Sequence, residues 1–274
     1  MIPNDNQGRK ESYCLSKKPC IKNYTSKQGG MRMSGFVLKL WAIFAMTLDH
    51  IGWAFVPRLS SMGFVLHFFG RTTAPIMCFC LVEGFHYTSS KEKYLLRMLL
   101  AAVIAQIPFS LYNSGTLFYP VGNMLFTLFL CLIALMAWDT TLPLVLRILA
   151  VVLTCAAAAF CDWSYYAVLF CLCFHIFRDN RLPRTIAFCA VVCWLHVEFY
   201  MMYAKFGSPD QALANVSIQS GLFLAAVLLW FYSGQKGRGG RFTQFLFYAY
   251  YPAHLLVLYL LKIWLLPGQY ALFG

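Results

Sequence analysis

The sequence predicts an all-α bundle of about nine transmembrane helices. Of its 274 residues, 60% are hydrophobic and only 12% are charged, about half the charged fraction of a soluble domain. Phe occurs 25 times and Tyr 16 times, which suits helices that face lipid and the interfacial belt. Polar residues divide the chain into apolar stretches, most of which approach the ~20 residues that cross a bilayer. The composition therefore excludes a soluble globular class.

A basic tail precedes the first apolar stretch. Residues 1–35 contain seven Lys and Arg residues and no long apolar core, so they are neither a span nor a cleavable signal. We expect a disordered cytoplasmic tail that lies against anionic headgroups. We expect no nucleic-acid partner, because the spans give this charge a membrane role. The transmembrane domain is expected over residues 36–274.

Nine apolar segments follow the tail. They are expected near 36–56, 62–87, 94–112, 123–138, 142–160, 164–177, 185–203, 213–232 and 242–265. The segments 123–138 and 164–177 are short for a bilayer, so the count extends from eight to ten. Pro75, Pro108 and Pro252 each lie inside a segment, where a proline bends the helix and leaves a carbonyl without its usual donor.

The loops between these segments differ in charge. The basic loops are SSKEKYLLR, RDNRLPR and SGQKGRGGR, whereas the intervening loops hold little positive charge. With nine spans, the three basic loops and the tail all fall on one side of the membrane. The positive-inside rule makes that side cytoplasmic, with the N-terminus inside and the C-terminus outside.

Ionisable residues stand deep within several spans. Each costs about 2.5–3.5 kcal/mol there, and so usually has a function or a partner. A rise of 1.5 Å per residue places Asp49 and His50 in the outer half, within reach of Arg71 and His254 on other spans. We therefore expect a polar cavity open to the outer face, with Asp49 paired to Arg71 and His50 available as a base. The alternative is a buried Asp49–Arg71 ion pair beside a structural histidine.

Further polar residues extend this interpretation. The expected cavity or substrate contacts are Glu83, Gln106, Asn123 and Tyr251. Four others are interpreted as interfacial residues, with the first of them at the outer mouth: Asp162, His196, Glu198 and His67. The C-x-C pairs point about 200° apart on a helix, and no other pattern completes a metal site, so no metal is expected.

Lys39 shares a helix face with His50. The two residues are 11 positions apart, which is 20° beyond three helical turns and about 16 Å along the axis. Lys39 would lie at the cytoplasmic rim, where an anionic cosubstrate arrives. An ordinary snorkelling lysine is the alternative.

Five stretches resemble the successive blocks of a known family. They are LKLWAIFAMTLDHIG, FFGRTTAPIMCFCLVEGFHYT, KYLLRMLLAAVIAQIPFSL, NMLFTLFLCLIAL and FYAYYPAHLLVLYLL. In this order they resemble the TraX family, named for the F-pilin acetylase of conjugative plasmids, and cover residues 38 to about 262. The resemblance implies a multi-pass protein of the bacterial cytoplasmic (inner) membrane. It also implies acetylation of the pilin amino terminus, with acetyl-CoA as the donor.

The Lys39-x10-His50 spacing is similar to the basic-x10-His motif of the acyltransferase-3 membrane family, whose basic residue is usually Arg. That similarity implies transfer from cytosolic acyl-CoA to extracytoplasmic acceptors, with the histidine as base. We accordingly expect His50 to be the general base, Asp49 to orient or balance Arg71, and either Arg71 or His254 to stabilise the oxyanion. The residues expected to receive the phosphates of acetyl-CoA are Lys39, Lys91, Lys93 and Arg97.

The expected function is therefore a membrane acyltransferase that acetylates an amine or hydroxyl of a pilin-like protein or an envelope glycan at the outer face. Two alternatives come from other classes. One is a proton-coupled transporter or flippase that uses Asp49, His50 and Arg71 as a relay. The other is a non-enzymatic pilus or envelope assembly factor. The sequence shows no internal repeat of the kind found in many transporters.

Overall fold

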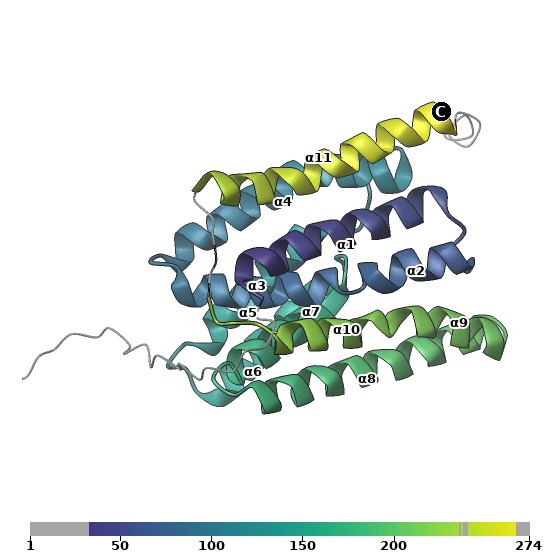
Figure 1. Cartoon of the computed structure of the whole chain (residues 1–274). Helices are drawn as coiled ribbons and strands as arrows, with labels where there is room; N and C mark the ends of the chain where they lie inside the picture. Colours follow the sequence, from purple (N-terminus) through teal and green to yellow (C-terminus); the bar gives the residue numbers. More distant parts are fainter. Residues whose placement is uncertain (1–32, 236, 238–240, 267–274) are drawn as a thin grey trace, which may run out of the picture. The chain divides into compact units, whose positions relative to one another are not determined.

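The computed structural model describes residues 33–266 except residue 236 and residues 238–240, and this part of the chain is helical without a named strand (Figure 1). The helices are α1 (Gly35–Phe55), α2 (Ser61–Gly70), α3 (Thr73–Tyr87), α4 (Lys91–Ser114), α5 (Met124–Trp138), α6 (Leu144–Ala158), α7 (Ser164–Ile176), α8 (Arg181–Phe206), α9 (Pro209–Gln219), α10 (Gly221–Trp230) and α11 (Arg241–Leu265). The tail predicted over residues 1–35 lies almost wholly outside the described residues.

Six helical segments of the described chain are long and apolar enough to cross a membrane: α1, α2 with α3, α4, α8, α9 with α10, and α11. The other three apolar helices are shorter, since α5 and α6 have 15 residues each and α7 has 13. At 1.5 Å per residue they extend about 20–23 Å, less than the ~30 Å hydrocarbon core. The apolar segments lie where the sequence places them, but the count of about nine spans is not confirmed.

The bundle has one end rich in Lys and Arg, which we call the basic end. Lys91 begins α4 there and pairs with Asp139 at the end of α5, with 2.7 Å between Lys91 Nζ and Asp139 Oδ2. Arg181, which begins α8, donates to the carbonyl of Trp230 at the end of α10. The chain reaches the other end after Phe55, and we call it the opposite end. In Figure 1 the basic end lies on the left and the opposite end on the right.

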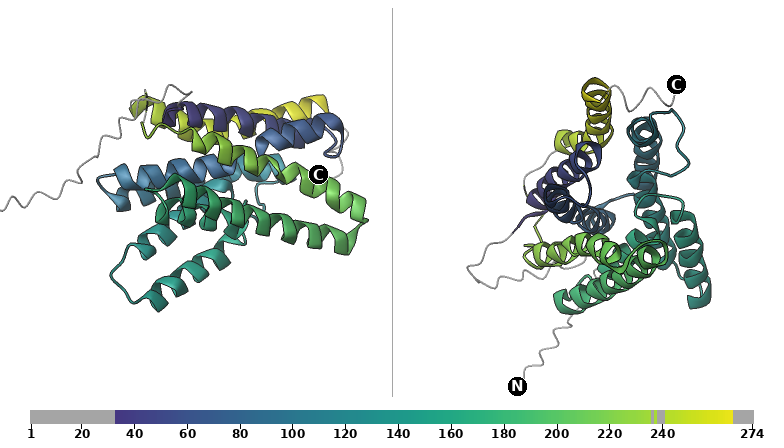
Figure 2. Two further views of the ribbon diagram at one scale, coloured as in Figure 1. Left: turned by 60° about the horizontal axis from the view of Figure 1, so that its bottom comes forward. Right: turned by 90° about the vertical axis from the view of Figure 1, so that its right-hand side faces the viewer.

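The helices α5, α6 and α7 extend only partway from the basic end. Asn123, which precedes α5, donates to the carbonyl of Ala102 in the middle of α4 over 2.8 Å. Gly122 bridges to Cys161, so the turn between α6 and α7 lies at the same depth. Figure 2 shows the three helices beside the longer ones in two further orientations. Their shortness leaves room for a cavity between this turn and the opposite end.

Two of the spanning segments are broken near their middle. α2 ends at Gly70 and α3 begins at Thr73, with Pro75 in its first turn, where a missing N–H is tolerated. This break confirms the bend predicted at Pro75, whereas Pro108 and Pro252 lie inside continuous helices. The second break, between α9 and α10 at Ser220, was not predicted.

The two broken segments touch at Gly221. A Cβ atom added there would lie 1.8 Å from the carbonyl oxygen of Phe68, a backbone atom that cannot move aside. Gly221→Ala should therefore separate the two segments and lower the free energy of unfolding by at least about 2 kcal/mol. A matched control is Gly207→Ala, because its nearest neighbour is the far end of the Gln211 side chain rather than a backbone atom. Thermal unfolding in detergent checks this prediction, and equal melting temperatures for the two variants would contradict it.

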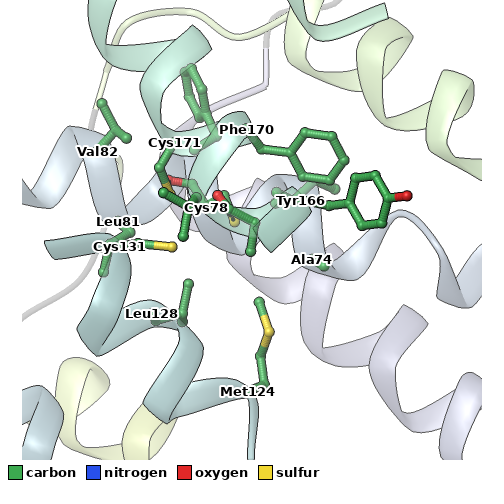
Figure 3. Packing of buried hydrophobic residues seen from close by; sticks show 14 of the residues in the cluster. Ala74, Cys78, Leu81, Val82, Met124, Leu128, Cys131, Tyr166, Phe170 and Cys171 are labelled. Atoms are coloured by element: carbon green, nitrogen blue, oxygen red, sulfur yellow. Dashed lines mark hydrogen bonds between the residues drawn. The ribbon is translucent and has the colours of Figure 1, made fainter. Parts of the chain in front are cut away.

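A tightly packed core lies at the junction of α3, α5 and α7. Figure 3 shows Ala74, Met124 and Tyr166 in the same cluster of buried side chains as a layer that contains Cys78, Cys131 and Cys171. All six residues are buried. This layer packs α3, α5 and α7 against one another.

Candidate functional site

A cavity of about 560 Å³ opens in the half of the bundle away from the basic end. Every helix except α6 and α10 contributes to its lining, together with Arg71 at the break of the second span. Its charged or titratable lining residues are Asp49, His50, Arg71, Asp162 and Glu198, and its aromatic walls include Trp53, Tyr112, Trp163, Tyr165, Tyr166 and Tyr251. The sequence predicted such a polar cavity in this half.

Asp49 accepts hydrogen bonds from two neighbouring side chains. Arg71 Nη2 lies 2.6 Å from its Oδ2 and His67 Nδ1 lies 2.8 Å from its Oδ1. The packing depends on Gly70, because a Cβ there would lie 2.4 Å from the Cβ of Asp49. The predicted Asp49–Arg71 pair is therefore present. His67 is only 1% exposed and was wrongly interpreted as interfacial.

His50 meets His254 at the wall of this cavity. His50 Nδ1 lies 2.9 Å from the carbonyl oxygen of Met46 and 3.1 Å from His254 Nε2. A carbonyl oxygen only accepts, so Nδ1 must carry the proton, and the lone pair of the neutral ring is on Nε2. His254 Nδ1 likewise donates to the carbonyl of Tyr250, over 2.9 Å, so its Nε2 can accept from His50.

Arg71 also lies over the indole ring of Trp163, with its guanidinium carbon 5.1 Å from the ring centroid. Asp162 stands beside them in the turn between α6 and α7, where its Oδ1 accepts from the N–H of Trp163. Burial raises the pKa of the Asp162 carboxyl to about 6, while Arg71 lowers it and Asp49 raises it. The sequence placed Asp162 at the outer mouth, which is wrong, because α6 and α7 are too short to carry their connecting turn that far.

The raised pKa of Asp162 predicts a pH dependence of stability. Burial disfavours the charged form of Asp162, so at pH 7 this carboxylate destabilises the folded protein. This destabilisation is relieved as the pH falls through about 6 toward the unfolded pKa, because the carboxylate becomes protonated. Asp162→Asn should raise the melting temperature at pH 7.5 by roughly 3–6 °C, equivalent to about 1–2 kcal/mol. The gain should shrink at pH 5.

Thermal unfolding of both proteins at the two pH values provides the measurement. A difference between Asp162→Asn and the wild type that is the same at pH 7.5 and pH 5 would contradict the prediction. Taking the difference in melting temperature between variant and wild type at each pH removes the contribution of titratable groups that both proteins contain.

Glu198 is the second cavity carboxylate that was interpreted as interfacial. Its Oε2 accepts from the hydroxyls of both Tyr165 and Tyr166, whose rings stack with centroids 4.4 Å apart. The two tyrosines occupy the first turn of α7. Glu198 thus belongs to the cavity wall and joins α8 to α7. The fourth residue of that group, His196, bonds to its own helix and does not line the cavity.

Three of the expected cavity contacts lie elsewhere. Asn123 Nδ2 donates to Gln106 Oε1 over 2.9 Å, and this bond holds the start of α5 against α4. Glu83 lies toward the basic end, where Arg178 and Tyr232 donate to its carboxylate. Of the expected catalytic and cavity residues, Asp49, His50, Arg71 and Tyr251 line the cavity, and His254 is reached through His50.

The four residues expected to bind acetyl-CoA phosphates fit that role unequally. Lys91 is paired with Asp139, so its charge is already balanced. Lys39 lies over the ring of Phe247, and Arg97 over that of Tyr94. Among the described side chains, Lys39, Lys93 and Arg97 have no carboxylate partner within 4 Å and retain charge for an anion. The described residues contain no group of three His, Cys, Asp or Glu able to hold a metal ion.

Fold and site together define a multi-pass helical membrane protein with a polar, aromatic-walled cavity around a histidine pair. The TraX protein family model matches residues 34–262, and the chain belongs to the TraX family. It is 37% identical over 243 residues to the probable fimbrial assembly protein FimC, serogroup H1, of Dichelobacter nodosus, a match that covers 85% of this chain and 97% of the relative. No solved structure matches the chain.

Proposed function

We propose that this protein is a membrane acyltransferase that moves an acetyl group from acetyl-CoA to the amino terminus of a pilus-type protein. The observation that carries the proposal is the orientation of His50 at the cavity wall. Met46 and His254 hold the proton on Nδ1, which leaves Nε2 as the basic atom. Membership of the TraX family and the fimbrial assembly name of the relative support a role in pilus biogenesis.

The proposed reaction joins the acceptor nitrogen to the thioester carbonyl carbon. An acceptor that binds as an ammonium first releases one proton to water, and the neutral nitrogen then attacks. As the N–C bond forms, His50 Nε2 takes a proton from this nitrogen, and the C–S bond then breaks. The proton passes to the departing thiolate, so the products are an amide and coenzyme A. His254 Nε2 accepts the Nδ1–H of His50 and stabilises the imidazolium during this step.

The cavity walls favour an amine over a hydroxyl acceptor. Among the described side chains, no Lys, Arg or His nitrogen lies within 4 Å of the carboxylates of Asp162 and Glu198. The rings of Trp53, Tyr165 and Tyr166 supply π faces that attract a protonated amine. We propose that the basic end faces the cytoplasm, so that acetyl-CoA arrives there while the acceptor enters from the opposite end.

A second candidate function is proton-coupled transport. The observation favouring it is the contact between two broken spans beside the Asp49–Arg71 pair, since discontinuous helices commonly form substrate and ion sites in transporters. A third candidate, a non-enzymatic assembly factor, agrees with the name of the relative alone.

Purified protein in nanodiscs, supplied with labelled acetyl-CoA, separates these candidates. A peptide with a free amino terminus should become acetylated there, as mass spectrometry would show, whereas the same peptide with a blocked amino terminus should not. Acetylation confined to serine hydroxyls would contradict the amine assignment. The absence of transfer to either peptide or to a sugar acceptor would contradict the enzyme, and uptake driven by a pH gradient would then support the transporter.

A further inference from the structure

Three helices begin at the cavity. The lining includes Thr73 and Ala74 from the first turn of α3, Met124 from that of α5, and Ser164 from that of α7. The first N–H groups of an α-helix have no partner within the helix, and the helix dipole adds partial positive charge there. Each of these first turns therefore needs acceptors from outside its own helix.

Two of the three first turns have such acceptors. Asn123 caps α5 by accepting from the N–H of Leu125 over 2.9 Å. The first turn of α7 has no side-chain cap, but the N–H of Ser164 donates to the carbonyl of Cys161 over 3.1 Å, and Asp162 accepts from the N–H of the preceding Trp163. The carboxylates of Asp162 and Glu198 thus already accept hydrogen bonds from residues at the start of α7.

The first turn of α3 lacks an equivalent partner. The side chain of Thr72, which precedes the helix, forms no cap and instead donates to the carbonyl of Phe69. Within the part of the chain that the structure covers, the N–H groups of Thr73 and Ala74 form no backbone hydrogen bond outside their helix. Both residues line the cavity. Two backbone donors are therefore available to a ligand there.

Side chains at the cavity wall supply a second, independent observation. Among the described residues, the hydroxyl proton of Tyr251 has no acceptor, the N–H of Met124 being the backbone group nearest its oxygen, and Tyr251 as a whole is 5% exposed. The Nε–H of Arg71 is likewise buried and unpaired, although Nη2 is engaged by Asp49. Both groups are donors at these atoms. The unsatisfied groups of the cavity thus call for an oxygen acceptor from the ligand.

We propose that Tyr251 and the first turn of α3 bind the carbonyl oxygen of the acyl donor and stabilise the oxyanion that forms on it. Tyr251 lies one helical turn before His254 on α11, and their ring centroids are 5.7 Å apart. The ring of Tyr251 therefore packs beside the histidine pair that handles the proton. This inference rests on the proposed function and adds a residue to its chemistry.

Tyr251 takes the oxyanion role that the sequence suggested for Arg71 or His254. His254 does not line the cavity, and its Nε2 faces His50. Arg71 donates through Nη2 to Asp49, so its charge is already balanced within the protein. The Tyr251 hydroxyl keeps its proton throughout and acts as a hydrogen-bond donor, strongest when negative charge develops on the carbonyl oxygen.

Steady-state acetyl transfer by Tyr251→Phe in nanodiscs tests the inference. The loss of one oxyanion donor should lower kcat by about 10²-fold and leave KM for acetyl-CoA nearly unchanged. The melting temperature should change little, because among the described residues the deleted hydroxyl proton has no acceptor to lose. Tyr248→Phe, three residues away on α11 and outside the cavity lining, is the matched control and should retain wild-type kcat.

The outcomes distinguish the inference from the proposed function. An active wild type whose kcat is unchanged in Tyr251→Phe would overturn the inference and leave the acyltransferase standing. Equal losses of kcat in Tyr251→Phe and Tyr248→Phe would also overturn it. A wild type that transfers no acetyl group would overturn the proposed function and the inference with it.

Discussion

Replacing His50 by glutamine should lower kcat for acetyl transfer by about 10²–10⁴-fold, the usual contribution of a positioned general base. Glutamine keeps a polar group of similar length but cannot take a proton at neutral pH. The geometry makes the loss specific to His50 Nε2, since Nδ1 is held by Met46 and His254. The purified variant should keep the wild-type melting temperature within a few degrees. Initial rates at saturating acetyl-CoA provide the measurement.

His196 supplies a matched control for this substitution. Its Nδ1 lies 2.8 Å from the carbonyl oxygen of Val192, four residues earlier, as His50 Nδ1 lies near that of Met46. His196 does not line the cavity. His196→Gln should therefore retain activity, and a comparable loss in both variants would show that His50 acts through the fold alone.

Replacing Arg71 by methionine should produce the largest loss of stability. The change leaves the Asp49 carboxylate, whose side chain is only 14% exposed, with His67 as its remaining partner. Breaking a buried ion pair by removing one partner costs about 3–5 kcal/mol, because the other charge stays buried without compensation. The apparent melting temperature and the yield of folded protein should both fall.

A second substitution separates charge from packing. Asp49→Asn combined with Arg71→Met removes both charges and should recover part of the lost stability. Lys91→Met is the control, because the Lys91–Asp139 pair is well exposed and should contribute no more than about 1 kcal/mol. If the double variant is no more stable than Arg71→Met, the loss does not come from an uncompensated Asp49.

Position along a single helix could be predicted from the sequence. Counting the rise per residue brought Asp49 level with Arg71, and the structure forms this contact. The direct contact between His50 and His254 was not predicted. The break beside Pro75 followed from the missing N–H of proline. These successes depend on local geometry, which one stretch of sequence contains.

Contacts that depend on how helices pack could not be predicted in this way. The His67–Asp49 bond requires Gly70 to bring α2 against α1, and no pattern in the sequence shows that approach. Asp162 was misplaced because an apolar stretch of 15 residues does not reveal whether it crosses the membrane or ends halfway. The unpaired state of Tyr251 depends on neighbours from several helices, so only the structure reveals it.

Transfer across a sealed membrane tests the central claim most directly. Proteoliposomes would carry labelled acetyl-CoA on the side of the basic end and a peptide with a free amino terminus on the other side. We predict that the wild type labels the peptide amino terminus and that His50→Gln does not. An unlabelled peptide with the wild type, or equal labelling by both proteins, would contradict an acyltransferase centred on His50.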